Sequence, residues 1–102
     1  DSQEHCGLVM AFVAHVCGVQ PPPSFLIARS WLSVGRKAPY PMPGDIVVLW
    51  TGTPDGPGGH VGLLEAVTDT DVWLIGGNQV NAIRSFKYDR NRILSIRRIW
   101  RA

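Results

Sequence analysis

The chain contains a cysteine, a histidine and an asparagine that could together perform acyl transfer, and they lie far apart in the sequence: Cys6, His60 and Asn78. A cysteine thiolate is a strong nucleophile, and a histidine of pKa about 6.5 can accept the thiol proton and pass it to a leaving amine. An asparagine amide oxygen can accept a hydrogen bond from the imidazole and hold the ring toward the sulfur. The three types therefore suggest amide hydrolysis through a thioester. Each also has a structural interpretation: a small buried hydrophobe, the end of a loop and a turn residue.

The position of Cys6 favours the chemical interpretation. Residues 7–17 are almost wholly apolar, which predicts a helix buried on all sides, with Gly18 ending it in the left-handed conformation. Cys6 would then stand at the helix N-terminus, where unpaired N–H groups and the helix dipole favour a thiolate. Cys17 lies in the same helix and is predicted to be a packing residue. Eleven residues of helix separate the two sulfurs by about 16 Å, so no disulfide is expected.

The elements around His60 and Asn78 are predicted to be strands. Gly58 and Gly59 leave space before His60, which opens a strand over 60–67, and a polar turn at 68–71 leads into a strand over 72–75. If these two strands pair as a hairpin, Asn78 returns beside His60. Further strands are expected at 46–50, 83–88 and 93–100. A second helix is expected over 25–34, capped by Ser24.

Helices followed by antiparallel strands predict an α+β fold, and 102 residues suffice for one domain spanning 1–102. Seven of the ten basic residues follow position 83, but the net charge of +2 is too small to indicate a nucleic-acid partner. No run approaches the roughly 18 apolar residues that cross a membrane, and no signal peptide is visible at the first residues. The localisation is therefore left open.

The remaining histidines and aromatic residues carry weaker expectations. His15 is expected to be a core or rim residue and Trp31 a core residue, whereas Trp50 and Tyr40 are candidates to line a groove. The spacing of cysteines and histidines matches no structural zinc pattern, so no metal is expected. No residue indicates a cofactor.

Four segments, in this order, resemble the NlpC/P60–CHAP superfamily of papain-like cysteine hydrolases, in particular its compact bacterial and phage members. They are Cys6 leading into 11–13 (Ala-Phe-Val), 28–35 (Ala-Arg-Ser-Trp-Leu to Gly), 43–48 (Pro-Gly-Asp-Ile-Val-Val) with 59–62 (Gly-His-Val-Gly), and 75–82 (Ile-Gly-Gly-Asn-Gln-Val-Asn-Ala). Together they span nearly the whole chain. The resemblance implies an NlpC/P60 (CHAP) fold, with N-terminal helices packed on an antiparallel sheet.

The resemblance also implies an activity, hydrolysis of an amide bond of the peptidoglycan stem peptide. Cys6 matches the nucleophile, His60 the base and Asn78 the third polar residue. The Cys6 N–H, with the Gln3 side chain, would stabilise the oxyanion. The residues expected to line the substrate groove are His5, Trp50 and Gln79.

The sequence is also compatible with two other functions. One is a non-catalytic domain that holds cell wall or a partner, and the other is a cysteine protease or acyltransferase that acts on a protein. The expected partner is bacterial peptidoglycan, at the periplasmic or extracellular wall, and an immunity or inhibitor protein is a further expected partner. Neither nucleic acid nor membrane is expected.

Overall fold

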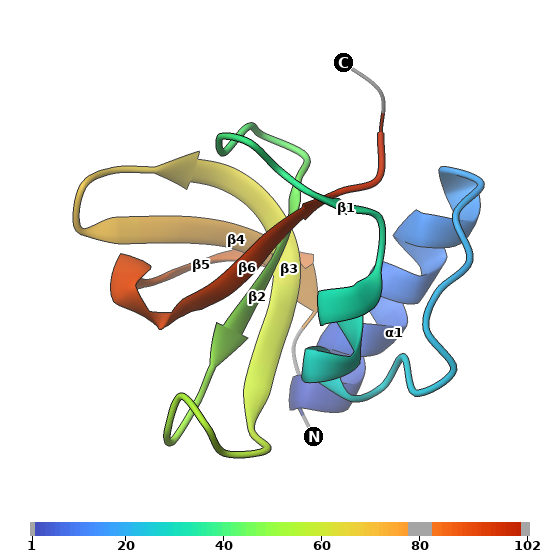
Figure 1. The fold of residues 1–102 in the computed structure, drawn as a ribbon, viewed down its shortest axis with the longest axis horizontal. Helices are drawn as coiled ribbons and strands as arrows, with labels where there is room; N and C mark the ends of the chain where they lie inside the picture. Colours follow the sequence, from blue (N-terminus) through green and yellow to red (C-terminus); the bar gives the residue numbers. More distant parts are fainter. Residues whose placement is uncertain (1, 78–82, 101–102) are drawn as a thin grey trace.

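A six-stranded antiparallel sheet forms the centre of the computed structural model (Figure 1). The structure describes residues 2–77 and 83–100, and the side chains of residues 2–6 and 8 lie outside that description. In chain order the elements are α1 (Ser2–Val16), the 3₁₀ helix η1 (Ala28–Ser33), β1 (Arg36–Lys37), β2 (Ile46–Trp50), β3 (Gly59–Val67), β4 (Asp71–Gly77), β5 (Ile83–Asp89), the 3₁₀ helix η2 (Arg90–Arg92) and β6 (Ile93–Arg98). The strand order across the sheet is β1-β6-β2-β3-β4-β5.

The predicted fold class, an α+β papain-like fold with N-terminal helices on a sheet, is wrong. The chain is 40% strand and 21% helix, which makes it a small β-rich fold. The predicted second helix is reduced to the six residues of η1, and Ser24 does not cap it; the residue before η1 is an extended Ile27. The carbonyl of Phe25 accepts a hydrogen bond from the indole N–H of Trp31 at 2.9 Å. This side-chain hydrogen bond competes with the backbone hydrogen bond that a helix through Phe25 would form.

The strand predictions are confirmed. The runs at 46–50, 60–67, 72–75, 83–88 and 93–100 correspond to β2 to β6, with ends shifted by one or two residues. β3 and β4 pair as the expected hairpin. The two-residue strand β1 was not predicted, because Arg36 and Lys37 are both exposed and join the sheet only through pairing with the end of β6.

The C-terminus of α1 also matches the prediction. Gly18 has φ of 74°, its N–H donates to the carbonyl of His15 at 3.0 Å, and the N–H of Val19 donates to that of Ala14 at 2.8 Å. This is the Schellman arrangement, in which a glycine turns the chain away while the last carbonyls keep partners.

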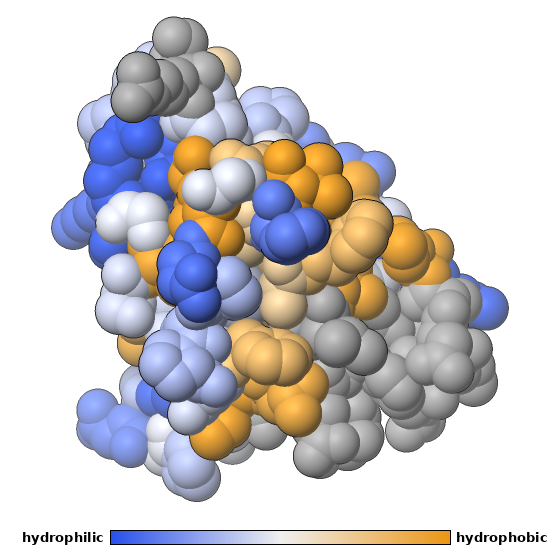
Figure 2. Space-filling view, turned by 90° about the vertical axis from the view of Figure 1, so that its right-hand side faces the viewer, coloured by the Kyte–Doolittle hydropathy of each residue, from blue (hydrophilic) through white to orange (hydrophobic). Residues whose placement is uncertain are grey.

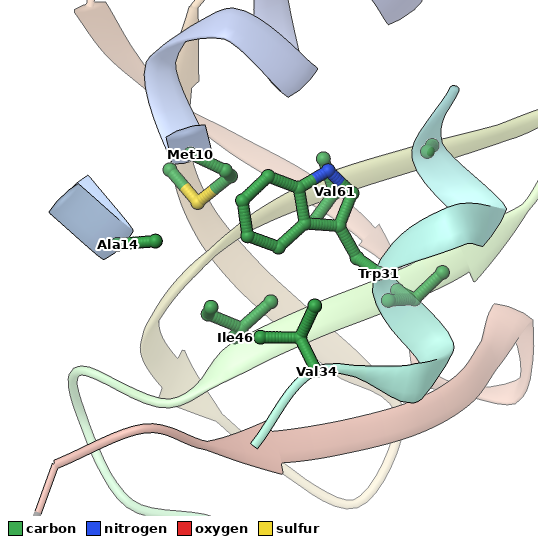
Figure 3. Packing of buried hydrophobic residues seen from close by; sticks show 8 residues of the cluster. Met10, Ala14, Trp31, Val34, Ile46 and Val61 are labelled. Atoms are coloured by element: carbon green, nitrogen blue, oxygen red, sulfur yellow. The ribbon is translucent and has the colours of Figure 1, made fainter. Parts of the chain in front are cut away.

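The sheet has an apolar cluster on each face. On the face toward α1, the indole of Trp31 lies between Met10 of the helix and Ile46 and Val61 of the sheet (Figure 3). Trp31 is fully buried, as expected for a core residue. On the other face, the residues of the second cluster pack together: Val47, Leu49, Leu64, Val72 and Leu74.

The prediction that the apolar helix is buried on all sides is wrong. Met10 and Ala14 are buried, but Phe12 and Val16 are each 68% exposed, and Cys17 is exposed instead of packed. Only one side of α1 meets the sheet, so the other is left to solvent. Apolar residues gather over the middle of this side of the molecule in Figure 2.

A buried ion pair joins the start of β2 to the end of β6. Arg98 donates to both carboxylate oxygens of Asp45, at 2.8 and 2.9 Å, and the second oxygen also accepts the N–H of Met42. The guanidinium lies 4.5 Å from the ring centre of Trp100 and 5.3 Å from that of Tyr40. Tyr40, predicted as a groove residue, therefore stacks on this pair. None of the described helices is long and apolar enough to span a lipid bilayer.

Candidate active site

Cys6 lies within α1 and not at its N-terminus. The helix begins at Ser2, so Cys6 is past its first turn. Only the first four N–H groups of a helix lack an intrahelical partner, so the predicted N-terminal position, with a free Cys6 N–H for an oxyanion, is wrong. The side chains of Cys6, Gln3 and His5 lie outside the described residues, and their roles stay predictions.

Residues 25–29, which include the first two residues of η1, lie beside Gly7 through their backbone and beside Gly59 through their side chains. A Cβ on Gly7, which follows Cys6, would collide with the carbonyl oxygen of Phe25. A Cβ on Gly59, which precedes His60, would lie 2.7 Å from the carbonyl oxygen of Leu49 and 3.4 Å from the Cβ of Ala28. Gly7 is therefore required by the carbonyl of Phe25, and Gly59 by the carbonyl of Leu49 in β2.

A hollow adjoins this meeting point. It has a volume of about 360 Å³ and is lined by residues 23–27. Leu26 and Ile27, which line it, are 41% and 51% exposed. The helix segment that carries Cys6 therefore packs against a chain segment with an accessible, largely apolar hollow.

His60 is the predicted site residue whose side chain the structure describes most fully, and its ring faces away from α1. Its strand partner is Leu49, a member of the cluster on the far face, whereas the next residue, Val61, packs under α1. The imidazole lies 5.5 Å from the ring of Tyr88, centre to centre. Its Nδ1 is buried and has no hydrogen-bond partner among the described residues.

Burial and a neighbouring cation keep His60 neutral. Desolvation, and secondly the positive charge of Arg92, lower the pKa of His60 below its ordinary value of 6.5. The guanidinium of Arg92 lies over the ring of Trp50 at 5.4 Å, at the end of β2. A neutral imidazole at pH 7 is the form that can accept a proton.

The structure describes only part of the predicted site. Gly7, beside Cys6, contacts the backbone of Phe25 and Leu26, whereas Gly59, beside His60, lies near the side chains of Ala28 and Arg29. The His60 side chain, however, lies on the face of the sheet opposite α1. Trp50, predicted to line the substrate groove, contacts Arg92. Asn78 and Gln79 lie outside the described residues, and their predicted roles are untested.

Arg29 is a neighbour of the site that belongs to one of the sequence motifs but has no predicted role. Its guanidinium donates to three carbonyls of the loop between β2 and β3: Gly58 at 2.8 Å, Pro54 at 2.7 Å and Thr53 at 2.9 Å. It thereby holds the loop that leads into His60. Arg92 and Tyr88 were also missed, because strand periodicity does not reveal which distant side chains meet across a curved sheet.

Among residues whose side chains are described, no group of three or more histidine, cysteine, aspartate or glutamate side chains is arranged to hold a metal ion. Comparison with protein-family models, curated proteins and solved structures finds no match to this chain. The resemblance to the NlpC/P60–CHAP superfamily thus rests on the motifs alone and stays a prediction.

Proposed function

We propose that the chain hydrolyses an amide bond in the peptide part of bacterial peptidoglycan, with Cys6 as nucleophile. The observation that carries the proposal is the close approach of Gly7, next to Cys6, to the backbone of Phe25 and Leu26. Phe25 and Leu26 also line a hollow of about 360 Å³. The side chains of Ala28 and Arg29, further along the same segment, lie 3.4 Å from where a Cβ on Gly59, next to His60, would be. The order of the sequence motifs supports the choice of substrate.

The reaction is acyl transfer with balanced steps. The Cys6 thiolate attacks the amide carbon, the C–N bond breaks, and the leaving amine takes a proton from the His60 imidazolium formed when the thiol was deprotonated. Water then attacks the thioester carbon while His60 accepts its proton; the C–S bond breaks, the acid product leaves, and the proton held by His60 returns to the Cys6 sulfur. The lowered pKa of His60 supports the base role, because it keeps the ring neutral and able to accept the first proton.

A second candidate function follows from the orientation of His60. A general base must come within about 3 Å of the proton that it accepts, directly or through one water. The ring of His60 stacks on Tyr88, on the face of the sheet away from α1. This orientation favours a domain that holds cell wall, or a partner, without cleaving it.

Digestion of purified peptidoglycan, with mass spectrometry of the released fragments, separates the two functions. The wild-type chain, Cys6→Ala and the matched control Cys17→Ala are compared, and His60→Ala is added to test the base. Hydrolysis that is lost in Cys6→Ala and His60→Ala but retained in Cys17→Ala supports the hydrolase. The fragment masses then identify the bond, which distinguishes an amidase from an endopeptidase.

The same proteins are tested for sedimentation with insoluble peptidoglycan. Binding that survives Cys6→Ala, with no fragments released by any variant, supports the non-catalytic domain. Equal loss of hydrolysis in Cys6→Ala and Cys17→Ala contradicts the assignment of Cys6. Cleavage of a protein substrate while peptidoglycan stays intact indicates a protease instead.

A further inference from the structure

Two hollows flank η2, on a part of the molecule that the proposed reaction does not use. One has a volume of about 240 Å³ and is lined by Asp71, Lys87, Tyr88, Asp89 and Arg92. The other has a volume of about 630 Å³ and is lined by Asp69, Thr70, Asp89, Arg90 and Asn91. Because Asp89 lines both, the hollows adjoin at the start of η2.

The walls of these hollows are fastened together. The N–H of Arg90 donates to the carbonyl of Thr70 at 2.9 Å, and its guanidinium donates to that of Thr68 at 2.8 Å. These bonds tie η2 to the turn between β3 and β4. A surface whose parts are already held in position loses little conformational entropy when a ligand binds.

Charges of both signs line the smaller hollow without pairing with one another. Asp71 and Asp89 are direct partners in the register of β4 and β5, which places two carboxylates side by side. The Asp89 side chain makes no capping bond to η2. Arg92 lies over Trp50. Within the described ranges, neither Lys87 nor Arg92 forms an ion pair with these carboxylates.

The charges around the smaller hollow indicate which kind of ligand it can bind. Two adjacent carboxylates repel each other and favour an ammonium group between them, whereas Arg92 and Lys87 favour a carboxylate. We propose that the hollow beside η2 binds a zwitterionic, amino-acid-like group, with its ammonium at Asp71 and Asp89 and its carboxylate at Arg92 and Lys87.

The identity of the natural ligand rests on the proposed function. A stem peptide that ends in an uncrosslinked diamino acid offers an ammonium group and a carboxylate on one residue. The hollow would hold this part of the wall at a position separate from residues 23–27. The ring of Tyr88, which lines the hollow, contacts His60, so the hollow and His60 are neighbours.

Isothermal titration calorimetry with three probes of similar length tests the inference in the absence of peptidoglycan. The probes are lysine, which carries both charges, cadaverine, which carries only ammonium groups, and glutarate, which carries only carboxylates. We expect lysine to bind more tightly than either of the others. Asp89→Asn and Arg92→Gln should each weaken lysine binding about tenfold, since each removes one charge-assisted contact.

The controls are Asp55→Asn, in the loop between β2 and β3, and Arg84→Gln, at the opposite end of β5. Both side chains are exposed and line neither hollow. Lys87→Gln gives a further variant, at a position where the side chain makes no described contact, should Arg92→Gln unfold the protein. Lysine binding no tighter than that of cadaverine or glutarate, or equal weakening by the controls, overturns the inference.

The outcome for this site is independent of the outcome for Cys6. Selective lysine binding without any wall fragments supports the zwitterion site and contradicts the hydrolase. Normal wall digestion without selective lysine binding supports the hydrolase and overturns the zwitterion site.

Discussion

Replacement of Trp31 by alanine tests whether α1 packs against the sheet through one side only. Trp31 is fully buried against Met10 and Ala14 of α1, and its indole N–H donates to the carbonyl of Phe25. Removing a buried tryptophan side chain costs about 3–5 kcal/mol. In a chain of this length about 4–8 °C of melting temperature is lost per kcal/mol, so the melting temperature should fall by at least about 12 °C.

Phe12→Ala is the matched control, because Phe12 is also aromatic but 68% exposed on α1. A surface replacement of this kind changes the free energy of unfolding by about 0.5 kcal/mol or less. Trp31→Phe retains an aromatic ring and adds a second comparison, since the lost hydrogen bond alone accounts for about 0.5–1.5 kcal/mol.

Urea unfolding followed by far-ultraviolet circular dichroism measures all three variants without relying on tryptophan fluorescence. If Phe12→Ala destabilises the chain as much as Trp31→Ala, both sides of α1 are buried, as the apolar sequence of the helix predicted. If Trp31→Ala costs less than about 1 kcal/mol, the indole is not the centre of the packing, and the reasoning from burial is refuted.

Three further predictions concern the surroundings of the candidate site. Gly7→Ala should lower the melting temperature, because the alanine Cβ would collide with the carbonyl of Phe25. This is expected although alanine is the better helix former by about 1 kcal/mol. An unchanged or raised melting temperature contradicts the close approach. The pKa of His60 is lowered in the folded state, so as the pH falls His60 is protonated in the unfolded chain before it is protonated in the folded one. The contribution of His60 to the free energy of unfolding should therefore be fully present above pH 6.5 and be lost below it. His60→Gln should flatten this part of the stability profile measured by urea unfolding, and an unchanged profile would show that another group causes the loss. Cys17 is exposed and should react with a thiol reagent in the native protein nearly as fast as in urea. Peptide mass mapping follows the reaction. Strong protection in the native protein would mean that the Cys17 side chain is packed, as the sequence suggested.

The strands were predictable because their information is local. β-branched runs bounded by glycine, proline and polar turns identified β2 to β6, and Gly18 identified the end of α1. The short strand β1 has no such pattern, since its pairing with β6 supplies its only regularity. The second helix was overestimated, because nothing in the local sequence indicates that the Phe25 carbonyl bonds the Trp31 indole.

The candidate site was only partly predictable. The sequence indicated Cys6 and His60 from residue type and flanking glycines, and the structure shows that Gly7 is needed beside the carbonyl of Phe25 and Gly59 beside the carbonyl of Leu49. It could not indicate which face of the sheet the His60 ring occupies. In a strand, a shift of register by one residue moves every side chain to the opposite face, so this orientation depends on the pairing of His60 with Leu49.

Composition, periodicity and turn residues by themselves predicted an apolar helix and a second helix followed by a series of antiparallel strands; the apolar helix and the strands are present, and the second helix is reduced to η1. They also determined which residues are chemically able to act as nucleophile and base. The tertiary structure decided that the sheet dominates the fold, that α1 covers one face of it, and that His60 stacks on Tyr88 with Arg92 nearby. The physical reason is that the periodicity of the sequence fixes how side chains alternate within one element. Contacts between distant segments decide which residues meet across the sheet, and they therefore decide the burial and the charge around each side chain.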